Sequence, residues 1–104
     1  MLDFTDQFGN KYKLYFRVEK YANNGALAVM AYTDEYEPYA TITKNLPESN
    51  NLRGNEAYLD TNNVGTLVSA MVNAGYIDIA DTAALSGFCV YPLGTFTDKF
   101  YAEV

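Results

Sequence analysis

The sequence predicts an α+β domain in which an antiparallel sheet of about five or six strands packs against one amphipathic helix. Three observations lead to this prediction. The N-terminal part alternates apolar and polar side chains in short runs, residues 64–74 repeat apolar side chains at helical spacing, and 49% of the 104 residues are apolar. A chain of this length and composition can bury one core, so residues 1–104 are expected to form a single domain.

The N-terminal strands are predicted to form a meander. In residues 11–20 the apolar side chains fall at every second position, as in a half-buried strand. Asn24 and Gly25 tolerate positive φ and favour a hairpin turn before the next strand. Pro38 lacks the N–H that a central ladder needs, so the chain is expected to break near it. The strands expected here cover residues 2–4, 11–20, 26–33 and 39–43.

The middle of the chain holds the predicted helix. Residues 45–55 show little periodicity and are predicted as a loop, followed by a short strand at residues 57–59. Asn62 or Asn63 is expected to cap the helix, and Gly75 is placed to end it in a left-handed conformation. Between these positions, apolar residues recur at i, i+3, i+4, i+7 and i+8, namely Val64, Leu67, Val68, Met71 and Val72.

The C-terminal third has weaker patterns. Residues 76–84 are predicted as a loop with a helical turn. Residues 86–91 are rich in β-branched and aromatic side chains, which predicts a buried strand that ends at Pro92. Residues 95–101 are predicted as a last edge strand.

Charge and missing residue types exclude several functions. The net charge of −6 disfavours direct contact with nucleic acid. The chain has no histidine, so nucleophile and metal sites built on imidazole are ruled out. Cys89 is the only cysteine and lies in an apolar run, which is typical of a buried thiol, and no membrane-spanning run is evident. We expect no cofactor, no catalytic residues, no membrane contact and a cytoplasmic location in a bacterial cell.

An acidic, tyrosine-containing segment is the candidate site. Residues 34–104 carry ten acids and three bases, whereas residues 1–33 carry three acids and four bases. If the later carboxylates share a face, they could dock on a basic protein that handles nucleic acid. The alternative is that these charged residues form a solvent-exposed turn that has no binding role. The candidate protein-binding residues are Asp34, Glu35, Tyr36 and Glu37, together with the interface-prone tyrosines Tyr32 and Tyr15.

Two other functions stay open. A small-ligand binder or carboxylate-based enzyme would use residues 60–63, and it would need a concave pocket there with paired acids in different environments. The same segment resembles the start of a calcium loop, but Val64 and Met71 stand where such a loop needs oxygen ligands. A structural subunit of a homo-oligomer would instead pair through an exposed strand edge near the C-terminus.

Five segments carry a resemblance: Asn24-Gly25-Ala26-Leu27-Ala28-Val29, Glu37-Pro38-Tyr39-Ala40, Asn45-Leu46-Pro47, Tyr58-Leu59-Asp60-Thr61-Asn62-Asn63 and Ser86-Gly87-Phe88-Cys89-Val90-Tyr91-Pro92-Leu93. In this order they are similar to a family of small uncharacterised proteins carried by phages, plasmids and conjugative elements, mainly of Gram-positive bacteria. The family has no assigned activity, and the resemblance spans roughly residues 22–96. It implies a mobile-element setting, in which small acidic proteins often counter host defences. The leading prediction is therefore a non-enzymatic binding protein, with inhibition of CRISPR or restriction enzymes as its specific form.

Overall fold

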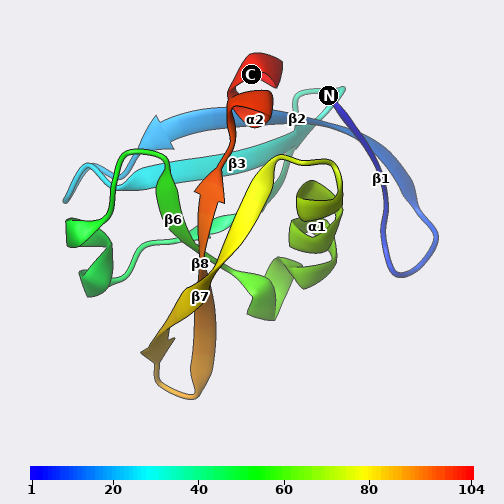
Figure 1. The fold of residues 1–104 in the computed structure, drawn as a ribbon. Coiled ribbons are helices and arrows are strands. Elements are labelled where there is room, and N and C mark those ends of the chain that lie inside the picture. The colour runs from blue at the N-terminus through cyan, green and yellow to red at the C-terminus, as the bar shows by residue number, and fades with distance from the viewer.

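The computed structural model describes residues 1–104 and contains eight strands in two four-stranded antiparallel sheets (Figure 1). The first sheet has the strand order β1-β2-β3-β4, and the second has the order β5-β6-β8-β7. The α+β class is confirmed, but the strands are more numerous than predicted and form two sheets. The strands are β1 (Leu2–Thr5), β2 (Lys11–Lys20), β3 (Leu27–Thr33), β4 (Pro38–Thr41), β5 (Thr43–Lys44), β6 (Glu56–Leu59), β7 (Ile77–Ser86) and β8 (Cys89–Phe96), and the helices are η1 (Pro47–Asn51), α1 (Thr61–Asn73) and α2 (Asp98–Glu103).

Both sheets and α1 contribute to one core of 15 buried residues. The predicted alternation in β2 is confirmed, because Leu14 is fully buried while its neighbours on the strand are exposed. β2 pairs with β3 in an antiparallel register that places Phe16 opposite Ala31 and Val18 opposite Val29. These pairs form the inner face of the first sheet, so the side chains between them point outward.

The predicted strand at residues 39–43 is divided between the two sheets at Ile42. This residue is completely buried. Its N–H donates to the carbonyl of Val29 in β3, and its carbonyl accepts from the N–H of Asp60 at the start of α1, each at 2.9 Å. The chain therefore leaves the first sheet and enters the second through one residue that is bonded to both halves of the fold.

Helix α1 begins three residues earlier than predicted. Val64 has non-helical angles (φ −128°, ψ 33°), so the first turn is kinked away from the rest of the helix. The prediction that Asn62 or Asn63 caps the helix is wrong, because Asp60 occupies the cap position. Asn63 Nδ2 instead donates to both carboxylate oxygens of Asp60, at 3.0 and 3.2 Å. Gly75 adopts φ +80° after the last turn, as expected.

The C-terminal third differs most from the sequence prediction. Residues 76–84, predicted as a loop, lie largely in β7, and the predicted strand at 86–91 contains the hairpin tip formed by Gly87 and Phe88. The strand β8 continues through Pro92, opposite Ala83. The predicted edge strand at 95–101 ends at Phe96, because the Thr97 side chain accepts from the N–H of Phe100 and starts α2.

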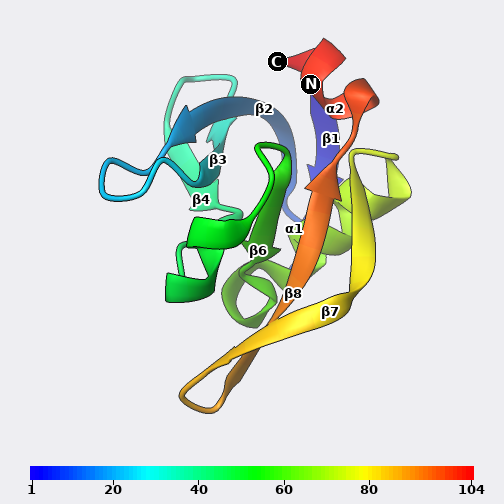
Figure 2. The same ribbon diagram turned by 60° about the vertical axis from the view of Figure 1, so that its left-hand side comes forward.

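The outer part of the β7–β8 hairpin, residues 83–92, projects from the body of the molecule, and we call it the arm (Figures 1 and 2). Its pairing register is interrupted between Ile79 and Ala83, where the arm leaves the body. A second buried cluster of four residues holds its root. This cluster consists of Leu46, Tyr58, Ala84 and Tyr91.

Candidate functional site

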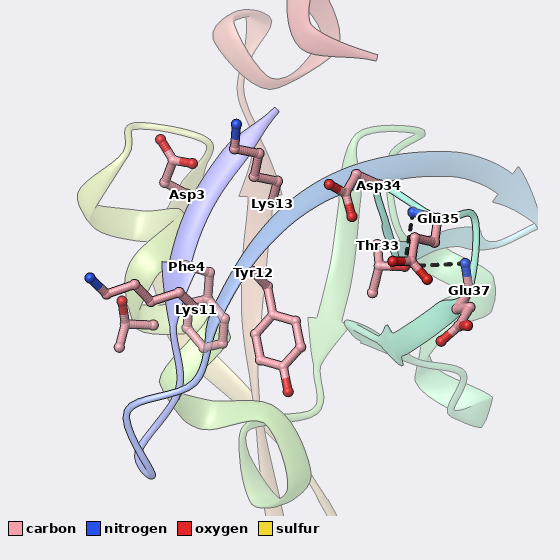
Figure 3. Close-up of a pocket in the computed structure, with 10 residues that line it drawn as sticks. Asp3, Phe4, Lys11, Tyr12, Lys13, Thr33, Asp34, Glu35 and Glu37 are labelled. Carbon is pink, nitrogen blue, oxygen red and sulfur yellow. Dashed lines mark hydrogen bonds between the residues drawn. The ribbon is translucent and has the colours of Figure 1, made fainter.

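The candidate acidic residues lie beside an open groove of about 740 Å³ at one end of the first sheet. Figure 3 shows Lys11 and Lys13 on one side of this groove and the acidic residues of the β3–β4 turn on the other, with Tyr12 between them. The ten lining residues are Asp3, Phe4, Thr5, Lys11, Tyr12, Lys13, Thr33, Asp34, Glu35 and Glu37.

The β3–β4 turn is held by backbone hydrogen bonds and by one hydroxyl. The N–H of Thr33 donates to the carbonyl of Glu37 at 2.9 Å, and the N–H of Tyr36 donates to the carbonyl of Thr33 at 3.0 Å. The Thr33 hydroxyl oxygen accepts from the N–H groups of Glu35 and Glu37, both at 3.3 Å (Figure 3). This pattern is that of a three-residue hairpin loop, whose last loop position requires a left-handed residue.

Tyr36 occupies that left-handed position with φ 64°, and it is the only non-glycine residue of the chain with positive φ. An L-residue in this conformation costs about 1–2 kcal/mol, which is why glycine or asparagine usually stands there. The Tyr36 side chain is 89% exposed, so burial of the ring does not offset the cost. The turn is therefore less stable than the same turn with glycine would be.

The other two candidate tyrosines form a cross-strand pair on the outer face of the first sheet. Tyr15 in β2 lies directly opposite Tyr32 in β3, and Tyr15 is exposed. The Arg17 guanidinium lies 5.9 Å from the centre of the Tyr32 ring, and the Tyr32 hydroxyl approaches the Met30 sulfur at 3.9 Å. The six candidate residues thus fall into three places: the acidic rim of the groove, the exposed tip of the turn, and this outer-face pair.

The groove carries charges of both signs. Four carboxylates (Asp3, Asp34, Glu35 and Glu37) and two lysines line it. The two ion pairs of the molecule, Met1 amino group to Glu103 and Arg17 to Glu19, lie elsewhere, so the charges of the groove are not paired with one another. Asp3, Lys11 and Lys13 were not among the predicted site residues, because their approach to the turn depends on the pairing of β1 with β2 and of β2 with β3.

A second groove of about 400 Å³ lies between the β1–β2 loop and the first turns of α1. Residues 61–63 line it together with Phe8 and Tyr39, so the surface is concave there, as the small-ligand hypothesis requires, but Asp60 does not line the groove. Asp6 is the one carboxylate among its lining residues, so the groove does not bring together the paired acids that the enzyme hypothesis needs. No cluster of three or more acidic or sulfur ligands is arranged to hold a metal ion.

The Asp6 carboxylate accepts hydrogen bonds from within the β1–β2 loop. Slight burial raises its pKa, but hydrogen bonds from the Asn10 side chain and from backbone N–H groups, including that of Phe8, outweigh this effect and keep the pKa below 3.8. The bonds from Asn10 N–H and Phe8 N–H measure 2.8 and 2.9 Å. Across the groove, burial raises the pKa of the Tyr39 hydroxyl, with smaller contributions from Tyr12 and Asp6. Both groups are therefore held in their ordinary forms at neutral pH.

Comparison with known proteins identifies the family but no activity. Residues 15–102 match the model of a domain of unknown function, DUF4313, and the chain belongs to this family. No curated protein and no solved structure matches the chain. None of the helices is long and apolar enough to cross a membrane.

Proposed function

We propose that the protein is a non-enzymatic binding protein that presents the β3–β4 turn and the Tyr15–Tyr32 pair to a basic protein partner. The observation that carries this proposal is Tyr36, which holds a costly left-handed conformation while its ring remains exposed. Local strain persists in natural sequences mainly where function requires it, because the fold gains nothing from it. An exposed tyrosine at a hydrogen-bonded turn is a suitable anchor for a protein interface, since it offers large contact area at low entropic cost.

The composition of the adjacent groove favours a protein partner over a small molecule. Only Phe4 and Tyr12 among its ten lining residues are hydrophobic, whereas small-molecule sites enclose their ligand among mainly apolar side chains. Carboxylates that lack an ion-pair partner can accept lysine or arginine side chains from another protein. Lys11 and Lys13 on the opposite side would orient such a partner by repelling its basic groups toward the turn.

In its specific form, the partner is a nucleic-acid-handling enzyme of the host, such as a CRISPR effector or a restriction nuclease. Such enzymes bind the phosphate backbone through basic grooves, and a cluster of carboxylates can compete for the same groove. The resemblance to proteins of mobile elements supports this choice. The protein would then inhibit the enzyme by occupying the groove in place of nucleic acid.

The test is capture of partners from lysates of several bacterial hosts, with elution in salt steps up to about 1 M, where the screening length falls to about 3 Å. We expect a basic protein that elutes early in the salt series. The triple variant Asp34→Asn, Glu35→Gln, Glu37→Gln should lose it, and so should Tyr36→Ala. Binding that persists in both variants would eliminate the turn as the binding surface.

A matched control separates the turn from overall charge. The variant Glu48→Gln, Asp78→Asn, Asp98→Asn removes the same three charges at exposed positions away from the turn, none of which makes a side-chain hydrogen bond or ion pair. We expect this variant to retain the partner. Equal loss in both triple variants would mean that only net charge matters, and the proposed site would be wrong.

The concave groove at residues 61–63 favours a second candidate function, the binding of a small uncharged polar ligand. Asn62 and Asn63 could donate to such a ligand, although both already use a side-chain N–H within the protein. A ligand at this position would contact the exposed ring of Phe8. A screen of metabolites by thermal shift, repeated with Phe8→Ser, would identify it.

A further inference from the structure

The arm carries the densest group of exposed apolar side chains on the molecule. Leu85 is 71% exposed and Val90 is 50% exposed, while Phe88 at the tip is fully exposed. Leu85 lies directly opposite Val90, so the two share one face of the hairpin. Ile79, at the base of the same strand, is 46% exposed. Isolated exposed apolar residues are normal, but a contiguous group on a projecting hairpin indicates an interaction surface.

The same segment offers free backbone hydrogen-bonding groups. β7 is the last strand of the second sheet, so one of its edges has no neighbour. The two-residue turn at Gly87 and Phe88 makes Ser86 and Cys89 the closing pair, and residues at alternate positions therefore direct their N–H and C=O groups away from β8. Ala83 and Leu85 are at those alternate positions. Pro92 lies opposite Ala83 and has no N–H group. This agrees with the pattern, because residues 83 and 92 exchange no backbone hydrogen bonds.

The charge distribution indicates which kind of partner the arm fits. Residues 82–97 contain no charged side chain, although the whole chain has a net charge of −6. Natural proteins usually guard exposed strand edges with charged residues, especially lysine, and residues 83–86 have none. Two copies of an acidic protein repel one another over most of their surfaces. The arm is a surface where a second copy can approach without that repulsion.

The area of the arm fits a small, weak symmetric interface. The break in register between Ile79 and Ala83 limits the straight free edge to residues 83–86. The Phe88 ring provides about 200 Å², and the Leu85 side chain provides roughly 100 Å². Two copies together would bury about 600 Å² of side-chain surface, in the range of weak, transient interfaces, and the backbone hydrogen bonds of the free edge add to this contact.

We propose that two copies of this chain associate through their arms, with the outer parts of the two β7 strands paired antiparallel about a two-fold axis at Leu85. Such an interface is isologous, because the same residues serve on both sides. Pairing joins the two second sheets into one continuous sheet and places Leu85 of each copy beside Leu85 of the other. It also brings Phe88 of each copy alongside the bulged residues 80–82 of its partner. This inference does not depend on the proposed function, since the β3–β4 turn belongs to the other sheet.

The test is the oligomeric state measured by light scattering at protein concentrations from about 10 µM to about 1 mM, since small interfaces bind weakly. We expect a concentration-dependent dimer of twice the monomer mass. Leu85→Lys places two like charges at the axis and should weaken the dimer at least tenfold. Ala83→Pro removes an outward N–H without removing a bond to β8, so it should also weaken the dimer.

Phe8→Ser provides the matched control, because it removes an exposed aromatic ring from the β1–β2 loop and should leave the dimer unchanged. Circular dichroism would verify that each variant is folded. A monomer throughout the concentration range would overturn the proposal. A dimer that survives both Leu85→Lys and Ala83→Pro would do the same, since it must use another surface.

Discussion

The β3–β4 turn and the tip of the arm each end in an exposed aromatic side chain, but they hold it differently. In the arm, Gly87 takes the positive φ of +61°, and Phe88 follows it in an ordinary conformation. In the β3–β4 turn, Tyr36 takes the positive φ itself. The turn around Tyr36 is rich in carboxylates, whereas the arm has no charge between residues 82 and 97.

The difference separates two ways of presenting an aromatic ring. The arm has a relaxed local backbone, but its position depends on packing at its root, where Ala84 and Tyr91 are buried. The acidic turn carries local strain but extends directly from β3 and β4 in the first sheet. Substitutions at the root of the arm should therefore have large effects on stability, whereas substitutions in the acidic turn should have small ones.

Tyr91→Ala should have the largest effect. The side chain is buried against Leu46 and Tyr58, so truncation leaves a cavity at the root of the arm and should lower the free energy of unfolding by about 3 kcal/mol. Urea denaturation would measure this loss. Tyr91→Phe, which keeps the ring, should retain most of the stability, and an equal loss in both variants would contradict the cavity explanation.

Gly87→Ala should have the next largest effect. Alanine at this positive φ strains the folded turn. It also makes the unfolded chain less flexible than glycine does, which offsets part of that cost. We therefore expect the free energy of unfolding to fall by about 1 kcal/mol. The midpoint of urea denaturation would report this loss. Added Cβ contacts do not contribute, because the space around Gly87 is open. An unchanged midpoint would mean that the turn relaxes to another type.

Tyr36→Gly should have the opposite sign. The substitution relieves the left-handed strain but increases the entropy of the unfolded chain, so the net gain in stability should be about 0.5–1 kcal/mol. Tyr36→Ala removes the ring but keeps the strain, and it should give no such gain. A variant that is more stable yet loses its partner would establish that Tyr36 is kept for binding. If Tyr36→Gly is not stabilising, the strain is smaller than proposed.

The smallest expected effect on stability is that of Asp6, in the loop between β1 and β2, and it depends on pH. The pKa of Asp6 is lowered in the folded protein, so its carboxylate contributes stability above pH 3.8, and this contribution disappears as pH falls through the folded pKa. Asp6→Asn should be less stable than the unmodified protein at pH 7, and the difference should shrink below pH 3.8. Denaturation midpoints measured across this range would test the sign.

The parts of the fold that the sequence predicted are those with a single strong periodicity. The alternation in β2 and the helical repeat in α1 arise because each element buries one face. β7 lacked such a signal, because only Ile77 and Ala84 of its ten residues are buried and much of the strand lies in the arm. The sequence contained signals for the two-residue turn at Gly87 and Phe88 and for the cap of α2 at Thr97. These signals were missed because the residues around them favour β-strands.

The candidate site was partly predictable for a similar reason. The acidic turn is local, so its residues could be identified from adjacent positions in the sequence. The pairing of Tyr15 with Tyr32 depends on the register of β2 and β3, and the approach of Lys11 and Lys13 to the turn depends on how β1, β2 and β3 lie together. Such arrangements follow from tertiary packing, which no periodicity in one segment encodes.

The position of Ile42 between the two sheets protects its backbone amide from exchange with solvent. Its amide is bonded to Val29, lies in the core and sits where the chain passes between the sheets, so local fraying cannot expose it to solvent. Hydrogen exchange at this one amide should therefore require global unfolding and should be among the slowest in the molecule. Amides in the outer arm should exchange much sooner in the monomer, and their protection at high protein concentration would report association directly.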